Sequence, residues 1–266
     1  MTFKKVVLVG VGGTGSLIVD GLCRLLIKKP DIPIFIIDYD RVAKKNLLRQ
    51  NFYPQDIGKF KSQVIAERYA RIYGRKIAYS ISPFEPDMIE QYWGENMGAA
   101  LVSNALIIGC VDSHTGRRAM AQALRHSLSW WLDTGNGYNS GQVLVGNVPH
   151  ADLMKGSFDA QRNLLLRAPA PSLQAPSLLQ PPTRVVKRDD CAEAIEDNRQ
   201  SQVINQSMAV LILEFVRRIL AGELTWLGAY MDMDAGTLKP VPADPAIVSR
   251  MLSIDQQDLM VPEIEI

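Results

Sequence analysis

The sequence predicts an α/β fold: a doubly wound, mostly parallel Rossmann-like sheet with helices on both faces. Short apolar runs rich in β-branched residues alternate with segments whose apolar residues have helical spacing, which is typical of a parallel sheet. Glycines cluster directly after the first of these runs. The chain has 266 residues, of which 47% are hydrophobic, enough to build one large core. We therefore expect a single domain over residues 1–266.

The first part of this domain, residues 1–150, contains most of the expected strands and helices. The first strand covers residues 4–9, and apolar residues at helical spacing predict a helix over 16–29. A buried strand over 32–38 precedes a helix over about 58–73. Further apolar runs lie at 76–82, 105–111 and 142–148, with a helical stretch at 117–129 between the last two.

The second part begins with residues 151–190, where prolines are frequent and disfavour helix and central strand. We interpret this segment as a long surface crossover loop, of the kind that often covers a substrate. Residues 191–266 form a C-terminal helix and β tail. The helix ends near Gly222, and two short strands flank a hairpin turn at 234–236.

Composition limits the classes of partner. Lys and Arg number 29 and Asp and Glu 28, so no net charge attracts nucleic acid or an anionic membrane. The apolar run near the N-terminus is too short for a signal peptide or a membrane span, which predicts a cytoplasmic protein. Cys23, Cys110 and Cys191 are widely separated, so we expect no zinc site.

The glycine cluster predicts a nucleotide site in residues 1–150. Gly10, Gly12 and Gly15 fit the spacing G-x-G-x-x-G between a strand and a helix, with Gly13 inside the turn. Such a turn lets backbone N–H groups and the helix N-terminus meet phosphate. Asp38 follows the second strand, where a carboxylate can accept hydrogen bonds from ribose hydroxyls. These residues alone suit a redox dinucleotide as well as ATP.

A distinctive block of residues starts at the end of the second strand: Asp38, Asp40, Val42, Asn46, Leu47, Arg49, Gln50, Phe52, Asp56, Gly58 and Lys61. Together with "GVGGTGS" upstream and "GCVDSHTGRR" downstream, it resembles the ThiF/MoeB-type, ubiquitin-activating-enzyme-like family of adenylating proteins over residues 6 to about 120. The segments "SWWLDTGNGYNSGQVLVG" and "CAEAIEDNRQSQVINQSMAVLILEFVRRIL" are most similar to ThiF-related proteins of bacterial PRTRC-type cassettes and extend the resemblance to about residue 222.

The resemblance implies that ATP is a substrate, with Mg²⁺, and that NAD is not bound. A nucleotide that is cleaved needs cations for its phosphates and a carboxylate for its metal ion. Arg49 and Lys61 suit the phosphates, and Asp112, after the strand at 105–111, suits Mg²⁺. Solvated surface charges, and a helix-capping role for Asp112, are the alternatives. The remaining implied binding residues are Asn46 and Gln50 around the phosphates, and Asp40 as a secondary contact.

Cys191 precedes the long C-terminal helix, and its role has two interpretations. A thiolate near a helix N-terminus has a lowered pKa, and Lys187 and Arg188 favour it, but Asp189 and Asp190 oppose it. Some similar proteins carry a cysteine here that accepts a ubiquitin-like protein as a thioester, whereas others use it without nucleophilic chemistry. Cys23 and Cys110 are expected to be core residues.

The implied function is adenylation of the C-terminal carboxylate of a small ubiquitin-like or sulfur-carrier β-grasp protein, followed by transfer to Cys191. A conjugating enzyme is a further partner, and a homodimer is expected. Arg117 matches an arginine of the family and is a candidate for the catalytic arginine that larger relatives supply from an N-terminal helix. The alternatives are a tRNA-modifying ATP-dependent dehydratase of the same superfamily, a catalytically silent nucleotide-binding scaffold and an NAD-dependent oxidoreductase.

Overall fold

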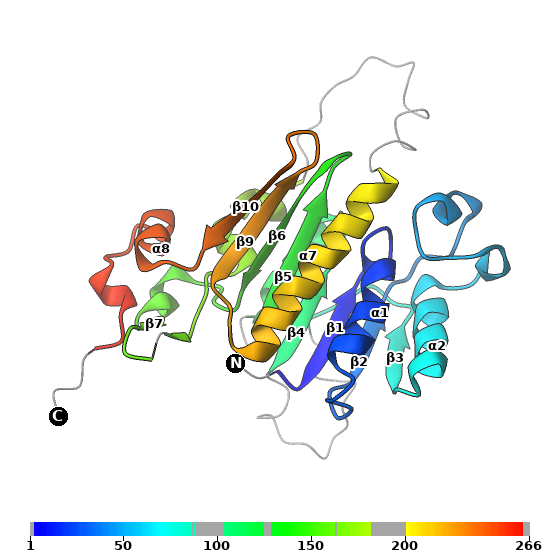
Figure 1. Ribbon diagram of the computed structural model, residues 1–266, viewed down its shortest axis with the longest axis horizontal. Helices are drawn as coiled ribbons and strands as arrows, with labels where there is room; N and C mark the ends of the chain where they lie inside the picture. The colour runs from blue at the N-terminus through cyan, green and yellow to red at the C-terminus, as the bar shows by residue number, and fades with distance from the viewer. Residues whose placement is uncertain are drawn as a thin grey trace.

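The computed structural model describes residues 3–86, 88, 104–124, 129–162, 164–181 and 201–262. Its centre is an eight-stranded sheet in the order β10-β9-β6-β5-β4-β1-β2-β3 (Figure 1). The strands are β1 (Lys5–Val9), β2 (Ile34–Ile37), β3 (Ile77–Ser80), β4 (Ala105–Gly109), β5 (Trp130–Asn136), β6 (Ser140–Gly146), β9 (Trp226–Asp232) and β10 (Thr237–Pro242).

The sheet has a parallel half and an antiparallel half. Strands β3, β2, β1, β4 and β5 are all parallel neighbours, whereas β6, β9 and β10 add to β5 in antiparallel fashion. The chain order reverses between β1 and β4, because β2 and β3 lie on one side of β1 and β4 on the other. In such sheets, ligands bind outside the carboxyl ends of the strands at this switch point.

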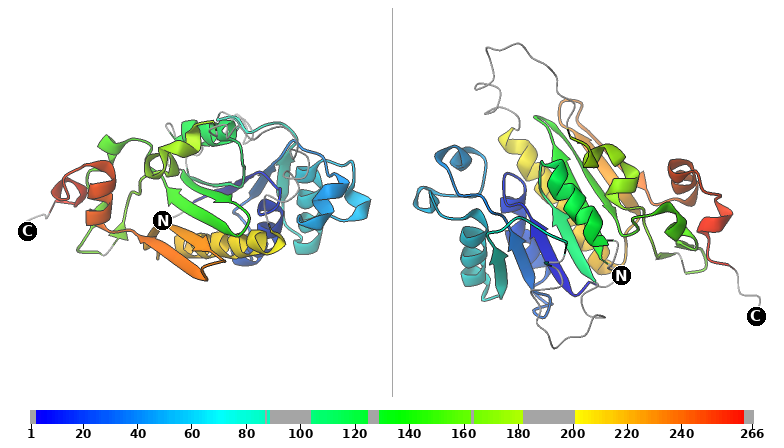
Figure 2. Two further views of the ribbon diagram at one scale, coloured as in Figure 1. Left: turned by 90° about the horizontal axis from the view of Figure 1, so that it is seen from above. Right: turned by 180° about the vertical axis from the view of Figure 1, so that it is seen from behind.

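Helices cover both faces of the sheet and enclose two hydrophobic cores (Figure 2). On one face lie α1 (Gly15–Leu25), α2 (Lys61–Tyr73) and α7 (Gln202–Ala221). On the other, α4 (His114–Ala123) packs over β4 and β5, and Met120 is fully buried there. Strands β1, β2 and β4 are buried at every position, which explains their nearly continuous hydrophobic runs. No helix in the described part of the chain is long and apolar enough to cross a membrane.

Most of the predicted elements are confirmed, including the helix after the glycine turn, the helix that begins at Lys61 and the C-terminal hairpin. The long helix α7 ends at Gly222, which has φ +73 and caps the helix in the left-handed conformation. The prediction of a helix over 117–129 is wrong in its bounds. Helix α4 starts earlier, at the N-cap Ser113, and Ser129 directly precedes β5, a strand that the prediction missed.

The crossover after β6 has more regular structure than the proline content predicts. It contains η5 (Ala151–Met154), β7 (Phe158–Asp159), β8 (Leu164–Leu165), α5 (Pro171–Gln174) and η6 (Pro176–Leu179). Pro171 and Pro176 stand in the first turns of α5 and η6, where a missing N–H costs nothing. Residues 182–200 lie outside the described part of the chain. The remaining elements are helix α8 (Pro245–Leu252) and three short helices, η1 (Lys44–Leu48), η2 (Pro54–Asp56) and η7 (Gln257–Leu259).

Candidate active site

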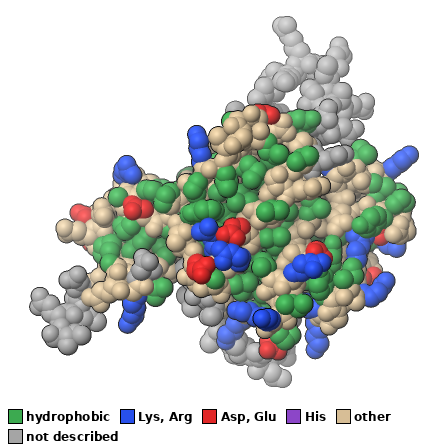
Figure 3. All heavy atoms as spheres, in the orientation of Figure 1, with side chains coloured by type: hydrophobic (Ala, Val, Ile, Leu, Met, Phe, Trp, Pro, Cys, Tyr) green, Lys and Arg blue, Asp and Glu red, His purple; other side chains and the backbone are tan. Residues whose placement is uncertain are grey.

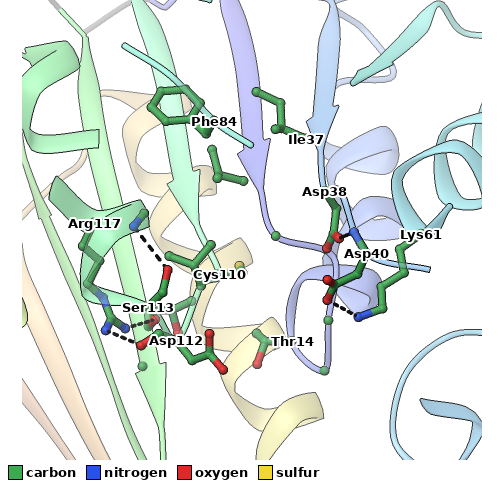
Figure 4. Close-up of a pocket in the computed structure, with 18 of the residues that line it drawn as sticks. Thr14, Ile37, Asp38, Asp40, Lys61, Phe84, Cys110, Asp112, Ser113 and Arg117 are labelled. Carbon is green, nitrogen blue, oxygen red and sulfur yellow. Dashed lines mark hydrogen bonds and ion pairs between the residues drawn. The ribbon is translucent and has the colours of Figure 1, made fainter. Parts of the chain in front are cut away.

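A cleft of about 770 Å³ lies at the carboxyl ends of β1, β2, β4 and β5 (Figure 4). Its volume is that of a nucleotide-sized site. Nine of the predicted site residues line it: Gly10, Gly12, Gly13, Asp38, Asp40, Arg49, Gln50, Lys61 and Asp112. Gly15 and Asn46 are not among the lining residues, and Cys191 lies outside the described residues.

The glycine turn forms the floor of this cleft. Two of its positions require glycine, because a side chain there would collide with the backbone. Gly10 has φ +86, and a Cβ atom would lie 2.6 Å from the carbonyl oxygen of Cys110. A Cβ at Gly15, the first residue of α1, would overlap the carbonyl oxygen of Gly10. Gly15 therefore does not line the cleft. Its missing side chain allows α1 to begin in direct contact with the backbone of Gly10. The N-terminus of α1, which is the positive end of the helix dipole, then lies toward the cleft.

Asp38, at the end of β2, joins this turn to the neighbouring strand. Its carboxylate accepts hydrogen bonds from the backbone N–H of Val11 at 2.7 Å and of Asp40 at 2.8 Å. Burial raises the pKa of Asp38, while these two N–H groups lower it. A carboxylate offers about four lone-pair positions, so two remain for ribose hydroxyls.

Lys61 and Asp40 form an ion pair on the same side of the cleft. The Lys61 ammonium lies 2.8 Å from a carboxylate oxygen of Asp40, and the Lys61 side chain is only 8% exposed. The backbone N–H of Lys61 also donates to the Asp40 carbonyl, at the start of α2. The position of the Lys61 side chain is thus fixed at both ends, with its stem buried and its ammonium beside an Asp40 carboxylate that is 55% exposed.

The η1 segment places Arg49 and Gln50 at the cleft. The Asn46 side chain accepts a hydrogen bond from the backbone N–H of Ala43 at 2.8 Å, and its carbonyl accepts from the backbone N–H groups of Arg49 and Gln50. Asn46 therefore shapes the turn that carries these two residues. The Oε1 atom of Gln50 is buried without a partner among the described residues.

On the opposite wall, Asp112 follows β4 and its side chain is exposed to the cleft. Ser113 caps α4 by accepting from Gly116 N–H at 3.2 Å, so the capping alternative for Asp112 is not needed. Arg117, one turn into α4, also lines the cleft and donates to the backbone carbonyl of Asp112 at 3.4 Å.

Two polar residues of this region, Asp133 and Asn205, were not identified from the sequence. Asp133 on β5 is fully buried and accepts from Arg117 Nε at 3.0 and 3.2 Å. Asn205 on α7, also fully buried, accepts from Thr14 and Asn136 at 3.3 and 3.0 Å, and its amide fills the space beside Gly13. The sequence carries no clear signal for either residue: Asp133 follows three apolar residues, and Asn205 is followed by two further polar residues, Gln206 and Ser207.

Cys23 is a buried core residue as predicted, whereas Cys110 is only partly buried and lines the cleft. Burial raises the pKa of Cys23 to about 11 and raises that of Cys110 as well, so both are thiols near neutral pH. Within the described part of the chain, no three His, Cys, Asp or Glu residues come together as a metal cluster.

Comparison with known proteins identifies the family. The ThiF family profile matches residues 1–237. Ubiquitin-like modifier-activating enzyme 5 of Dictyostelium discoideum is 30% identical over 143 residues, which cover 51% of this chain and 36% of that protein. The chicken (Gallus gallus) enzyme of the same name is 28% identical over 141 residues, 51% of this chain and 34% of that protein. The matched region thus spans about a third of these curated relatives.

The fold is shared with solved structures. The crystal structure of E. coli MccB with ATP has a TM-score of 0.56 and 15% identity, covering 90% of this chain and 63% of that chain. MccB with MccA-N7isoASN has a TM-score of 0.58 and 15% identity, with 90% of this chain and 64% of that chain covered. The glycine turn, the block after Asp38 and the profile match agree, and the chain belongs to the ThiF family.

Proposed function

We propose that this protein is an ATP-dependent activating enzyme, an adenylyltransferase acting on the C-terminal carboxylate of a small ubiquitin-like or sulfur-carrier protein. The observation that carries the proposal is the composition of the cleft. A glycine turn and a ribose-binding acid would suffice for a resident dinucleotide. Here Lys61, Arg49 and Asp112 stand around the same cleft, and these are groups that a triphosphate needs when it is cleaved.

Each side chain has a part in the proposed reaction. Asp38 accepts the ribose hydroxyls, and the N-terminus of α1 receives phosphate oxygens. Lys61 and Arg49 donate to the phosphates and offset the charge that develops as the triphosphate divides. A carboxylate oxygen of the partner attacks the α-phosphorus. The bond from that phosphorus to the bridging oxygen breaks, and pyrophosphate leaves with its electron pair.

The residues of the cleft fit a magnesium ion bound together with ATP. Mg²⁺ prefers oxygen ligands and is commonly held by one or two carboxylates plus substrate phosphates, without a cage made only of protein. Asp112 offers such a carboxylate, exposed at the carboxyl end of β4. Bound there, the ion would offset phosphate charge. Asp112→Ala should therefore abolish Mg²⁺-dependent turnover.

Thioester transfer is the second part of the proposal. The sulfur of Cys191 would attack the acyl carbon of the adenylate, AMP would leave, and the thiol proton would pass to solvent. Cys191→Ala should keep adenylation but lose a thiol-sensitive adduct with the partner. Cys23→Ala is the matched control, because the Cys23 thiol is buried. An adduct that persists in Cys191→Ala would exclude this cysteine.

Support for a peptide or protein substrate comes from the similar proteins: the curated relatives are activating enzymes for ubiquitin-like modifiers, and one MccB structure contains MccA. The direct test is intact-mass analysis of a small β-grasp protein after incubation with this enzyme, ATP and Mg²⁺. We expect AMP attached to its C-terminal carboxylate, and none with Asp112→Ala. AMP on a tRNA, or hydride transfer with NAD, would contradict the proposal.

A further inference from the structure

A buried ion pair stands behind the wall of the cleft that carries Asp112. Asp133, on β5, has no exposed surface, and both of its carboxylate oxygens accept from Arg117 Nε, at 3.0 and 3.2 Å. Gly109 on β4 is its register partner, and a Cβ there would lie 3.2 Å from Asp133 Oδ1 and 2.6 Å from Met120 Cε. The absence of a side chain at Gly109 thus makes room for the carboxylate.

The rest of the guanidinium is held by backbone carbonyls. Nη2 of Arg117 donates to the carbonyl of Thr134 at 3.2 Å, and Nη1 donates to that of Asp112 at 3.4 Å. An arginine has two N–H groups on each Nη atom, so one on each remains beyond these bonds. The side chain is 11% exposed, and this exposed part faces the cleft, which Arg117 lines together with Asp112 and Gly135 (Figure 4).

Stability alone is a weak reason for this arrangement. Removing two charges from water carries a desolvation penalty. Well-packed apolar residues of the same volume often give equal or greater stability. What the pair does provide is orientation, since Nε is fixed from behind while the Nη edge stays at the cleft. Gly135 keeps that edge open, because a Cβ there would lie 3.2 Å from Nη2.

We propose that Asp133 is a positioning residue that holds the Arg117 guanidinium so that its remaining Nη N–H groups donate to the phosphates of the nucleotide beside Asp112. This inference rests on the proposed adenylation and adds a donor on the wall opposite Lys61. The α-phosphate would then have cations on both sides of the cleft. Because Asp133 balances the charge of Arg117, the pair supplies directed donors without adding net charge.

The test compares Asp133→Asn, Arg117→Met and the double variant in partner-dependent ATP–pyrophosphate exchange. Losing a charge-assisted hydrogen bond corresponds to a roughly ten- to hundredfold effect, which we expect in kcat/KM for ATP of Asp133→Asn, with about tenfold of it in KM and the rest in kcat. Because Asp133 acts through Arg117, the double variant should be no slower than Arg117→Met. Glu214→Gln, which breaks an ion pair on α7 away from the cleft, is the matched control and should exchange normally.

Thermal unfolding separates positioning from mere packing. In each single variant one buried charge loses its partner, whereas the double variant removes both charges and should regain part of the lost Tm. We expect regained stability with exchange still low. A double variant that regains both, or Asp133→Asn with parental kcat/KM for ATP, would overturn the inference.

A binding measurement keeps the inference independent of the proposed reaction. By titration calorimetry, Asp133→Asn should bind ATP about tenfold more weakly but adenosine with unchanged affinity. Equal loss for both, or loss for neither, would contradict a role toward the phosphates. If the parent protein shows no exchange but this selective loss is found, the proposed function fails while the inference stands.

Discussion

At the scale of single residues, the Lys61–Asp40 pair is the sharpest feature of the cleft. Lys61→Met keeps the apolar stem and removes the ammonium, which is held 2.8 Å from Asp40. Because a charge-assisted hydrogen bond is worth about 1.5–3 kcal/mol, ATP affinity should fall roughly ten- to hundredfold. Titration calorimetry with ATP checks this. Lys28→Met, on an exposed loop, is the control, and parental affinity in Lys61→Met would remove this lysine from the site.

A second prediction at this scale concerns the glycine turn. Gly15→Ala forces a Cβ against the carbonyl oxygen of Gly10, whereas Gly74→Ala, at the end of α2, meets nothing within 4 Å. Overpacking costs about 1–3 kcal/mol, and a residue at φ +58 about 1–2 kcal/mol, so both variants lose stability. Only Gly15→Ala displaces the turn. Chemical denaturation with ATP titration should show weakened ATP binding for Gly15→Ala and parental binding for Gly74→Ala.

The positions of site residues were predictable where they belong to a local motif. The spacing of Gly10 and Gly12 and the position of Asp38 sufficed to predict that these residues lie together at one cleft. Nothing local identifies Asp133 or Asn205, because each acts on a residue far away in the chain and is found only when strands and helices pack. Asn46 shows the converse: its polar side chain fits the motif, yet in the structure it shapes the turn that carries Arg49.

At the scale of elements, periodicity predicted the helices with one polar face and the fully apolar strands. It missed β5, whose apolar residues Trp130–Leu132 are followed by the buried polar pair Asp133 and Thr134. The Asp133 carboxylate accepts from Arg117 Nε, which makes that polar side chain acceptable inside a strand, whereas Arg117 meets Thr134 only at its backbone carbonyl. The prolines of the crossover were similarly misleading, since at the first position of a helix a proline stabilises the turn that it would break elsewhere.

The pH dependence of helix α7 provides a test at this scale. Glu214 binds Arg217 and Arg218, and the hydrogen bond from Arg217 is the main reason that its pKa falls to about 2 from 4.5. Because the pKa is lower in the folded state, this stabilisation is complete above about pH 4.5 and is lost as the pH falls toward 2.

We expect Glu214→Gln to be less stable than the parent protein near neutral pH. The difference in the free energy of unfolding should shrink between about pH 4.5 and about pH 2, as Glu214 takes up a proton in the parent. Urea denaturation at a series of pH values measures it. A difference that stays constant with pH would show that the two arginines do not stabilise the charged form.

At the scale of the whole molecule, the face formed by α7 and the neighbouring strands carries exposed apolar side chains (Figure 3). Val203 and Val210 on α7 are 55% and 69% exposed, and Leu238 on β10 is 46% exposed. The outer strand β10 contains Pro240 and Pro242, which lack N–H donors and disfavour pairing with another edge strand. If the protein is a homodimer, we therefore expect helix faces, rather than strand edges, to form the contact.

Light scattering after size-exclusion chromatography tests this expectation. The 29.5 kDa chain should elute with twice that mass, and Val210→Lys should shift it toward the monomer because a charge would be buried in the contact. Arg24→Gln, an exposed substitution on α1, serves as the control. A monomeric parent protein, or a dimer that Val210→Lys leaves intact, would contradict a contact through α7.

The proposed function requires that the nucleotide in this cleft is cleaved and not only bound. ATP–pyrophosphate exchange measures this most directly, because labelled pyrophosphate enters ATP only when the α-phosphate has been transferred reversibly. With a small β-grasp protein present, we predict exchange in the parent protein and none in Asp112→Ala. Exchange without any protein partner, or no exchange with ATP bound and partners of this class supplied, would contradict the account.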